Sequence, residues 1–401
     1  MRQRETDRPP FERAQRLALI VGLVALALAV VGAFFDTTRF FRSYLFAYVF
    51  WLEIALGCLS ILMVYYVAGG TWGLILRRFL EASIMTLPLM AVLFVPLLLG
   101  LDELYPWARP EIVAADEVLQ HKQPYLNVPF FLVRTAIYFA VWIGLALFLN
   151  RWSATEGCIQ ERTGDAAMVG RLRRTSAPGL LLFALTVTFA SVDWLMSLEP
   201  HWFSTIYGMM FVAEQILVAL TFVVLLVTWL SDRQPLADAV SPQYFNDMGN
   251  LLLAGVLLWA YIAYSQFVII WFGNLVEEVP WYLRRMNGGW EWISIFLVVF
   301  HFALPFVLLL FRVTKRRPRY LFSVACLLLL VHLINVYWLV LPAFFPEGLL
   351  PHWLDVVMPV GIGGLWSAVY IWRLKEKFSL PIYGLAAEET RERREYEAEA
   401  S

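Results

Sequence analysis

Ionisable residues inside or beside long apolar runs are the part of this sequence most able to do chemistry. The turn Asp193-Trp194-Leu195-Met196-Ser197-Leu198-Glu199-Pro200-His201 holds two carboxylates and a histidine within nine residues. Asp193 lies inside the apolar run that this turn ends. A carboxylate in such a position is costly unless it is paired, hydrated or protonated, so Asp193 marks a candidate functional site by default.

Deeper ionisable residues occur in other apolar runs. Glu53 lies about 14 Å along its run, judged from the rise of an α-helix, and Glu214 lies at a similar depth in another run. A proton relay needs titratable groups within hydrogen-bond reach, with waters bridging the gaps. The sequence therefore predicts a proton path through Glu53, Asp193, Glu214, His301 and His332.

Each of these residues also has a structural interpretation. Arg134, about one turn into its run, either pairs with a neighbouring carboxylate or reaches toward the membrane surface. His301 and His332 either bond to a hydroxyl or a backbone carbonyl, or act as axial haem ligands on facing helices. Glu199 and His201 are either ordinary turn residues or part of a site. If a quinone binds here, the residues predicted to lie near it are Asp193, His201 and Arg134.

The composition is that of a polytopic membrane protein. The chain is 60% hydrophobic and 16% charged, whereas a soluble domain is about 45–50% apolar and about 25% charged. A net charge of −1 offers no basic excess for nucleic acid. A transmembrane helix needs about 20 apolar residues. Ten runs qualify: 15–35, 44–68, 79–100, 129–149, 177–198, 204–230, 248–272, 290–312, 319–341 and 354–374.

The distribution of Lys and Arg predicts the orientation of these spans. Of the 31 basic residues, 24 fall in the termini and in alternate loops, and 6 fall in the opposite loops. Because cytoplasmic loops carry the excess of Lys and Arg, both termini are expected in the cytoplasm. The predicted organisation is a cytoplasmic segment 1–16, a membrane domain 17–374 and a charged cytoplasmic tail 375–401.

Motifs for common cofactors are missing from the sequence. The three cysteines form no CxxC or CxxCH motif, and there is no Walker A motif, dinucleotide fingerprint or HExxH. We therefore expect no cofactor and no metal ion bound by this chain.

A weak internal repeat is visible at an offset of four spans. Phe50-Trp51-Leu52-Glu53 in the second span matches Phe211-Val212-Ala213-Glu214 in the sixth. Val192-Asp193-Trp194-Leu195 in the fifth span matches Val336-Tyr337-Trp338-Leu339 in the ninth. The predicted fold is thus an all-α membrane protein with two four-helix bundles, spans 2–5 and 6–9, and a peripheral helix at each end.

The turn from Asp193 to Thr205, Asp193-Trp194-Leu195-Met196-Ser197-Leu198-Glu199-Pro200-His201-Trp202-Phe203-Ser204-Thr205, resembles the signature of the F subunit of bacterial alternative complex III. That complex is a quinol:cytochrome c, or high-potential iron–sulfur protein, oxidoreductase. The resemblance covers essentially the whole chain, and its general features are shared with the wider NrfD/polysulfide-reductase membrane subunits. It implies a multi-pass protein of the bacterial cytoplasmic membrane.

The same resemblance implies that electron carriers belong to partner subunits. Those partners are an NrfD-like C subunit, an iron–sulfur B subunit, multihaem cytochrome c subunits and small membrane subunits, with lipids around them. Haems and iron–sulfur clusters would lie in the partners, and quinone or menaquinone is the one cofactor that this chain would meet. The implied roles of the chain are scaffolding and proton translocation.

A stand-alone proton-coupled secondary transporter is the competing hypothesis, since buried carboxylates and a repeat fit that class as well. Two features weigh against it. The two repeat units keep the same orientation, and no pair of spans broken by Gly or Pro stands at matching positions.

Overall fold

The computed structural model describes residues 11–70, 72–160, 166–234 and 236–378. Every secondary-structure element in these ranges is helical, and ten helices are long and apolar enough to span a membrane. The predicted fold class, an all-α integral membrane protein, is confirmed. The spans are α1 (Phe11–Ala33), α2 (Thr37–Ala68), α3 (Trp72–Ile84) with α4 (Leu87–Leu99), α8 (Val128–Gln160), α9 (Ala166–Trp194), α10 (Tyr207–Leu230), α12 (Pro242–Gly273), α14 (Trp290–Leu297) with η4 (Val298–Ala303) and α15 (Leu304–Leu310), α17 (Pro318–Val340) and α18 (Leu354–Phe378).

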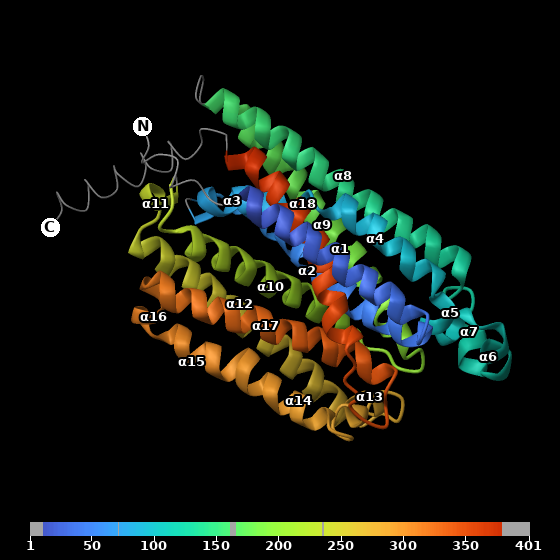
Figure 1. Ribbon diagram of the computed structural model, residues 1–401. Helices are drawn as coiled ribbons and strands as arrows, with labels where there is room; N and C mark the ends of the chain where they lie inside the picture. The colour runs from blue at the N-terminus through green and yellow to red at the C-terminus, as the bar shows by residue number, and fades with distance from the viewer. Residues whose placement is uncertain (1–10, 71, 161–165, 235, 379–401) are drawn as a thin grey trace.

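Short helices connect the spans at the two ends of the molecule (Figure 1). We call the end where α1 begins and α18 ends the terminal face, and the opposite end the loop face. The loop face carries α5 (Leu101–Leu104), η2 (Pro106–Ala108), α6 (Pro110–Ala115), α7 (Glu117–Lys122), η3 (Met196–Leu198), α13 (Pro280–Arg284) and η5 (Leu341–Ala343). The terminal face carries α11 (Leu236–Ala239) and α16 (Arg312–Arg316).

Several helices run further than hydropathy predicts. α2 begins at Thr37 rather than near residue 44, because the Asp36 side chain caps it by accepting a hydrogen bond from the Arg39 amide. α8 and α9 continue past their apolar parts into the stretch expected to be a loop. Residues 1–10 and 379–401, which hold most of the two predicted terminal segments, lie outside the described residues.

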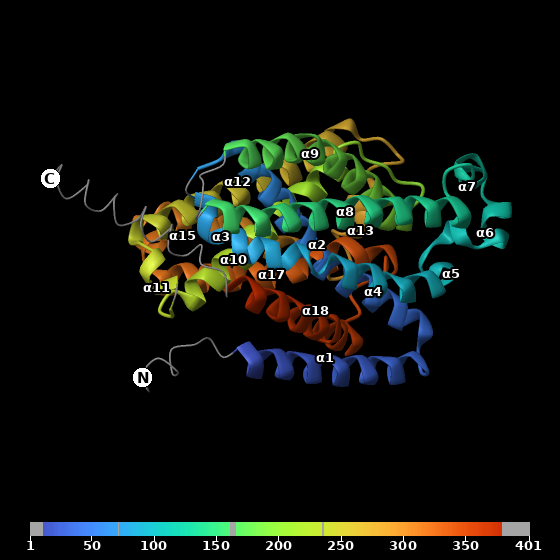
Figure 2. The same cartoon turned by 90° about the horizontal axis from the view of Figure 1, so that it is seen from above.

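The helices form two bundles joined by a central pair (Figures 1 and 2). α2 packs against α3, α4 and α9, and α8 completes this first bundle through α4 and α9. α10 packs against α12 and α17, and α14 and α15 complete the second bundle. α2 and α10 contact each other directly, while α1 lies along α18 at the periphery.

The central pair comes unusually close at Gly57. A Cβ atom on Gly57 would lie 1.9 Å from the backbone oxygen of Gln215 on α10. Only glycine allows this approach. Since Glu53 lies one turn before Gly57, and Glu214 is adjacent to Gln215, the contact brings both carboxylate-bearing segments to the interface between the bundles.

Two spans are interrupted, each next to a proline. α3 ends and α4 begins around Thr86, two residues before Pro88, and the eighth span contains the π-helix η4, just before Pro305. A proline ring clashes with the carbonyl four residues earlier, which favours a break or a widened turn. These are the third and eighth spans, which do not correspond in a four-span repeat, so no matching pair of broken helices is present among the described residues.

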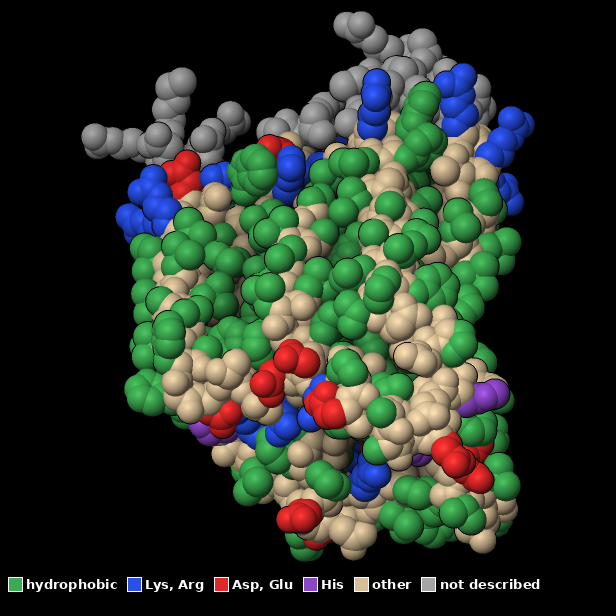
Figure 3. All heavy atoms as spheres, turned by 90° about the vertical axis from the view of Figure 1, so that its right-hand side faces the viewer, with side chains coloured by type: hydrophobic (Ala, Val, Ile, Leu, Met, Phe, Trp, Pro, Cys, Tyr) green, Lys and Arg blue, Asp and Glu red, His purple; other side chains and the backbone are tan. Residues whose placement is uncertain are grey.

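The surface of the molecule has a broad apolar band (Figure 3). Hydrophobic side chains cover the middle and upper part of this view, Lys and Arg are most numerous at its upper edge, and acidic, basic and histidine side chains lie together in its lower part. Such a band suits burial in hydrocarbon, with charged residues at the two water interfaces.

Candidate functional site

A group of buried polar residues lies where the two bundles meet. Glu53 on α2 and His332 on α17 are 0% and 1% exposed, and Glu53 Oε2 lies 2.6 Å from His332 Nε2. A carboxyl group and an imidazole at this distance share one hydrogen bond, whichever of them holds the proton. The partner of His332 is therefore a carboxylate, rather than the hydroxyl or carbonyl considered from the sequence.

Glu214 is held beside this pair by two neutral donors. Its Oε1 atom accepts hydrogen bonds from Asn335 Nδ2 at 3.1 Å and from Trp259 Nε1 at 3.3 Å. Asn335 follows His332 by three residues on α17, so both project from one face of that helix. α17 thus supplies a partner to each of the two glutamates that occupy equivalent positions in the repeat.

His301 on η4 completes the group. Its ring centroid lies 5.8 Å from that of His332 and 4.1 Å from that of Trp259. Neither ring nitrogen of His301 has a hydrogen-bond partner among the described residues. We call Glu53, Glu214, His301, His332 and Asn335 the central cluster.

The central cluster contains further buried polar atoms that lack a described partner. They are Glu53 Oε1, Glu214 Oε2 and His332 Nδ1. Buried polar atoms in native proteins are nearly always hydrogen-bonded, because leaving one unpaired costs free energy. Unpaired acceptors and imidazole nitrogens in one small region are suited to receiving a proton, a water or a polar ligand atom.

Asp193 belongs to a separate site in the first bundle. Arg134 binds it with both Nε and Nη2, at 2.8 and 3.0 Å, and the Tyr138 hydroxyl donates to it at 2.7 Å. Arg134 thus pairs with a neighbouring carboxylate, one of the two roles considered from the sequence. Among the described residues no hydrogen bond or ion pair joins Asp193 to the central cluster.

The remaining ionisable residues of the turn after Asp193 point to two further places. Glu199 is buried and forms ion pairs with Arg284 and Arg285. The His201 side chain is 60% exposed, and its Nε2 lies 2.8 Å from Asp116 Oδ2 in the loop before α7. The turn therefore ties the loop-face segments together instead of forming one site with Asp193.

Sequence reasoning missed two of the polar partners and two buried ion clusters. Asn335 and Trp259 are neutral, so a search for ionisable residues does not find them. Glu81 on α3 is paired with Arg77, Arg78 and Lys377 near the terminal face. The remaining cluster joins Arg39, Ser43 and Asp355. The pairings visible in the sequence are those of Glu81 with Arg77 and Arg78, four and three residues before it on one helix.

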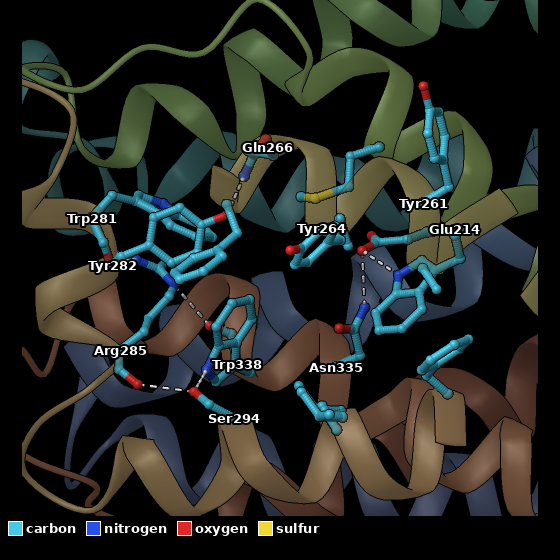
Figure 4. A pocket seen from close by; sticks show the side chains of 18 of the residues that line it. Glu214, Tyr261, Tyr264, Gln266, Trp281, Tyr282, Arg285, Ser294, Asn335 and Trp338 are labelled. Carbon is cyan, nitrogen blue, oxygen red and sulfur yellow. Dashed lines mark hydrogen bonds between the residues drawn. The ribbon is translucent and has the colours of Figure 1, made fainter. Parts of the chain in front are cut away.

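A cavity adjoins the central cluster within the second bundle. It has a volume of about 740 Å³, and Glu214 and Asn335 are part of its wall (Figure 4). Among the described residues no group of three or more His, Cys, Asp or Glu side chains is arranged to hold a metal ion.

Comparison of the chain with models of known protein families finds no match, and comparison with curated proteins finds none either. The likeness to the F subunit of alternative complex III therefore rests on the turn and the repeat quoted above.

Proposed function

We propose that this chain is a membrane subunit of a respiratory quinol:cytochrome c, or high-potential iron–sulfur protein, oxidoreductase, and that its central cluster transfers protons. The observation that carries the proton role is the 2.6 Å contact between Glu53 and His332, buried beside Glu214 and His301. The family resemblance suggests the complex, and the geometry supports the role within it.

A proton can pass between Glu53 and His332 along their hydrogen bond without any rearrangement. His301 lies next to His332, and Glu214 lies close enough to Glu53 and His332 to interact with both electrostatically. The four titratable groups are therefore electrostatically coupled, and waters that bridge the gaps beyond the Glu53–His332 bond would let protons move among them. Glu53 and Glu214 come from equivalent positions of the repeat, and all but Glu53 belong to the second bundle.

Tyr207 supports a route from the central cluster toward the loop face. It is the first residue of α10, is buried, and lies within electrostatic range of Glu53 and Glu214 and also of Glu199 and Arg285. A phenol hydroxyl both donates and accepts, so it can relay a proton between these groups. If the predicted orientation holds, this route leads to the outer side of the membrane.

Under this proposal the electrons stay in partner subunits, as the resemblance implies, and this chain couples proton movement to their redox chemistry. The bacterial cytoplasmic membrane and cytoplasmic termini are part of the same proposal, supported by the distribution of Lys and Arg.

Replacement of Glu53 by Gln in the intact complex tests the proton role. In reconstituted vesicles, Glu53→Gln should lower the number of protons moved per electron while the complex still assembles. Glu103→Gln is the matched control, since Glu103 is half-buried and accepts a hydrogen bond from the Thr38 hydroxyl, away from the central cluster and from Tyr207. An unchanged stoichiometry in Glu53→Gln, and in the equivalent Glu214→Gln, would refute the role.

Purification in mild detergent tests membership of a complex. A complex subunit should come out with cytochrome and iron–sulfur partners, whereas a secondary transporter would come out alone. The two interrupted spans among the described residues do not correspond in the repeat, which weighs against the transporter.

A further inference from the structure

The cavity in the second bundle has the size and the walls of a ligand pocket. Its volume of about 740 Å³ falls within the roughly 300–1,000 Å³ typical of small-molecule sites. α10, α12, α13, α14, η4 and α17 all contribute to its wall, which is mainly apolar and aromatic. An apolar cavity of this kind excludes water and accepts an apolar molecule.

The mouth of the cavity faces sideways, toward the lipid. Tyr261 and Tyr264 on α12 belong to the wall and are 71% and 68% exposed, and Val298 at the start of η4 is 62% exposed. All three lie within membrane-spanning segments. An opening between α12 and η4 therefore leads to hydrocarbon, and the molecule that enters must be soluble in it.

Polar groups stand at two separate places along the wall. At one, Glu214 presents its unpartnered Oε2 atom, while Asn335 and Trp259 hold Oε1. At the other, Gln266 Nε2 lies 3.4 Å from the hydroxyl of Tyr282. Figure 4 shows these two groups on opposite sides of the cavity. Trp259 and Gln266 are two turns apart on α12, which separates the groups by about 10 Å along the helix.

We propose that this cavity binds an isoprenoid quinone or quinol, with its ring between Glu214 and Gln266 and its tail leaving between α12 and η4. A para-quinone carries oxygens on opposite sides of a flat ring, so with a hydrogen bond of about 2.8 Å at each end it suits polar groups set this far apart. A quinol hydroxyl would donate to Glu214 Oε2, and the aromatic wall would contact the ring faces.

A phospholipid fits the same cavity less well. Its phosphate would meet the carboxyl group of Glu214 at one polar end. The nearest cation in the wall, Arg285, is already bonded to Glu199 and to the backbone oxygens of Trp281 and Leu339. The head group recognised here is therefore a neutral ring with hydrogen-bonding oxygens.

This location differs from the one predicted from the sequence. The predicted quinone-proximal residues Asp193, His201 and Arg134 lie outside this cavity wall. Both carboxylate oxygens of Asp193 are already bonded to Arg134 and Tyr138. We therefore place the proposed quinone site in the second bundle, apart from these residues.

Photolabelling of the intact, detergent-solubilised protein with its partners tests the site. The probe is an azido-benzoquinone that carries an isoprenoid side chain, and labelled peptides are identified by mass spectrometry. Ala263→Trp, and separately Ala260→Trp, would fill the cavity from its α12 wall. Ala254→Trp is the matched control, because Ala254 is an exposed α12 residue outside the wall.

We expect the label on α12 and on α14 or η4, and we expect unmodified quinone to compete with the probe. Labelling should fall on the order of tenfold in both cavity-filling variants but not in the control. Label confined to other segments, full labelling of both cavity-filling variants, or equal competition by phosphatidylglycerol would overturn the proposal. The choice of a quinone as the ligand rests on the proposed function, whereas the cavity and its polar groups do not. Labelling is measured without turnover, so failure of the proton role would leave its result unchanged.

Discussion

The Arg134–Asp193 pair provides a quantitative test of whether Asp193 serves structure or proton transfer. Replacement of Arg134 by Met would remove its two hydrogen bonds to Asp193 and a third to the Tyr125 backbone oxygen. Asp193 Oδ1 would be left without a donor, while Tyr138 still bonds Oδ2. Breaking a buried ion pair on one side costs about 3–5 kcal/mol, because the remaining charge is uncompensated. The free energy of unfolding in mixed micelles should fall by that amount.

The double variant Arg134→Met with Asp193→Leu separates the cost of an orphaned charge from the worth of the pair. Replacing a buried pair by apolar residues of similar volume is often neutral or stabilising. We therefore expect the double variant to recover most of the lost stability, which a double-mutant cycle would report as strong coupling. A single variant as stable as wild type, or a double variant no better than the single, would refute this reasoning.

The same double variant also tests the proton path predicted from the sequence. If Asp193 only holds α8 against α9, the reconstituted complex should keep its proton-to-electron stoichiometry. A lower proton-to-electron stoichiometry in a stable double variant would indicate that Asp193 takes part in proton transfer.

Three further predictions follow from single contacts. Gly57→Ala should destabilise the protein by about 1–3 kcal/mol in a thermal unfolding assay, because its Cβ would overlap an α10 carbonyl. Gly144→Ala is the control in that assay, because a Cβ there meets open space. Equal destabilisation by the two variants would contradict the close packing at Gly57. Glu81→Gln should cost about 3–5 kcal/mol by leaving three buried cations around a neutral amide; unchanged unfolding in mixed micelles would count against this. Although desolvation acts to raise the pKa of Asp116, hydrogen bonds from α7 amides and the nearby His201 lower it overall. Because the pKa of Asp116 is lower in the folded loop than in the unfolded chain, where it is about 3.9, its ionised form stabilises the loop at any pH above about 3.9. That stabilisation is lost as the pH falls through the lower, folded-state pKa. Limited proteolysis of the loop should therefore accelerate only in strong acid, and acceleration near neutral pH would refute it.

Much of the fold could be predicted because hydropathy is a local property. All ten spans appear close to their predicted positions, and the two four-helix bundles follow the repeat in Phe50–Glu53 and Phe211–Glu214. Boundaries were less predictable, since capping by Asp36 and the prolines near the breaks in the third and eighth spans act through backbone geometry that average hydropathy does not register.

The candidate site could be predicted only in part. Four of the five predicted proton-path residues, Glu53, Glu214, His301 and His332, do come together. Asp193 is bonded elsewhere, because Arg134 on the neighbouring helix reaches it in a bidentate geometry. A single charged residue in an apolar run indicates that this residue needs a partner inside the membrane. The sequence does not show which other helix supplies that partner.

The sequence by itself determined that ten runs are long and apolar enough to span a membrane and that a few ionisable groups must be satisfied inside them. That follows from the cost of moving charge and unpaired backbone into hydrocarbon, which every span meets on its own. Only the tertiary structure decided which groups meet: Glu53 and His332 are 279 residues apart, and Arg39 and Asp355 are 316 apart. Such pairings, and the cavity beside Glu214, depend on how helix faces pack, and packing is a property of the assembled bundles.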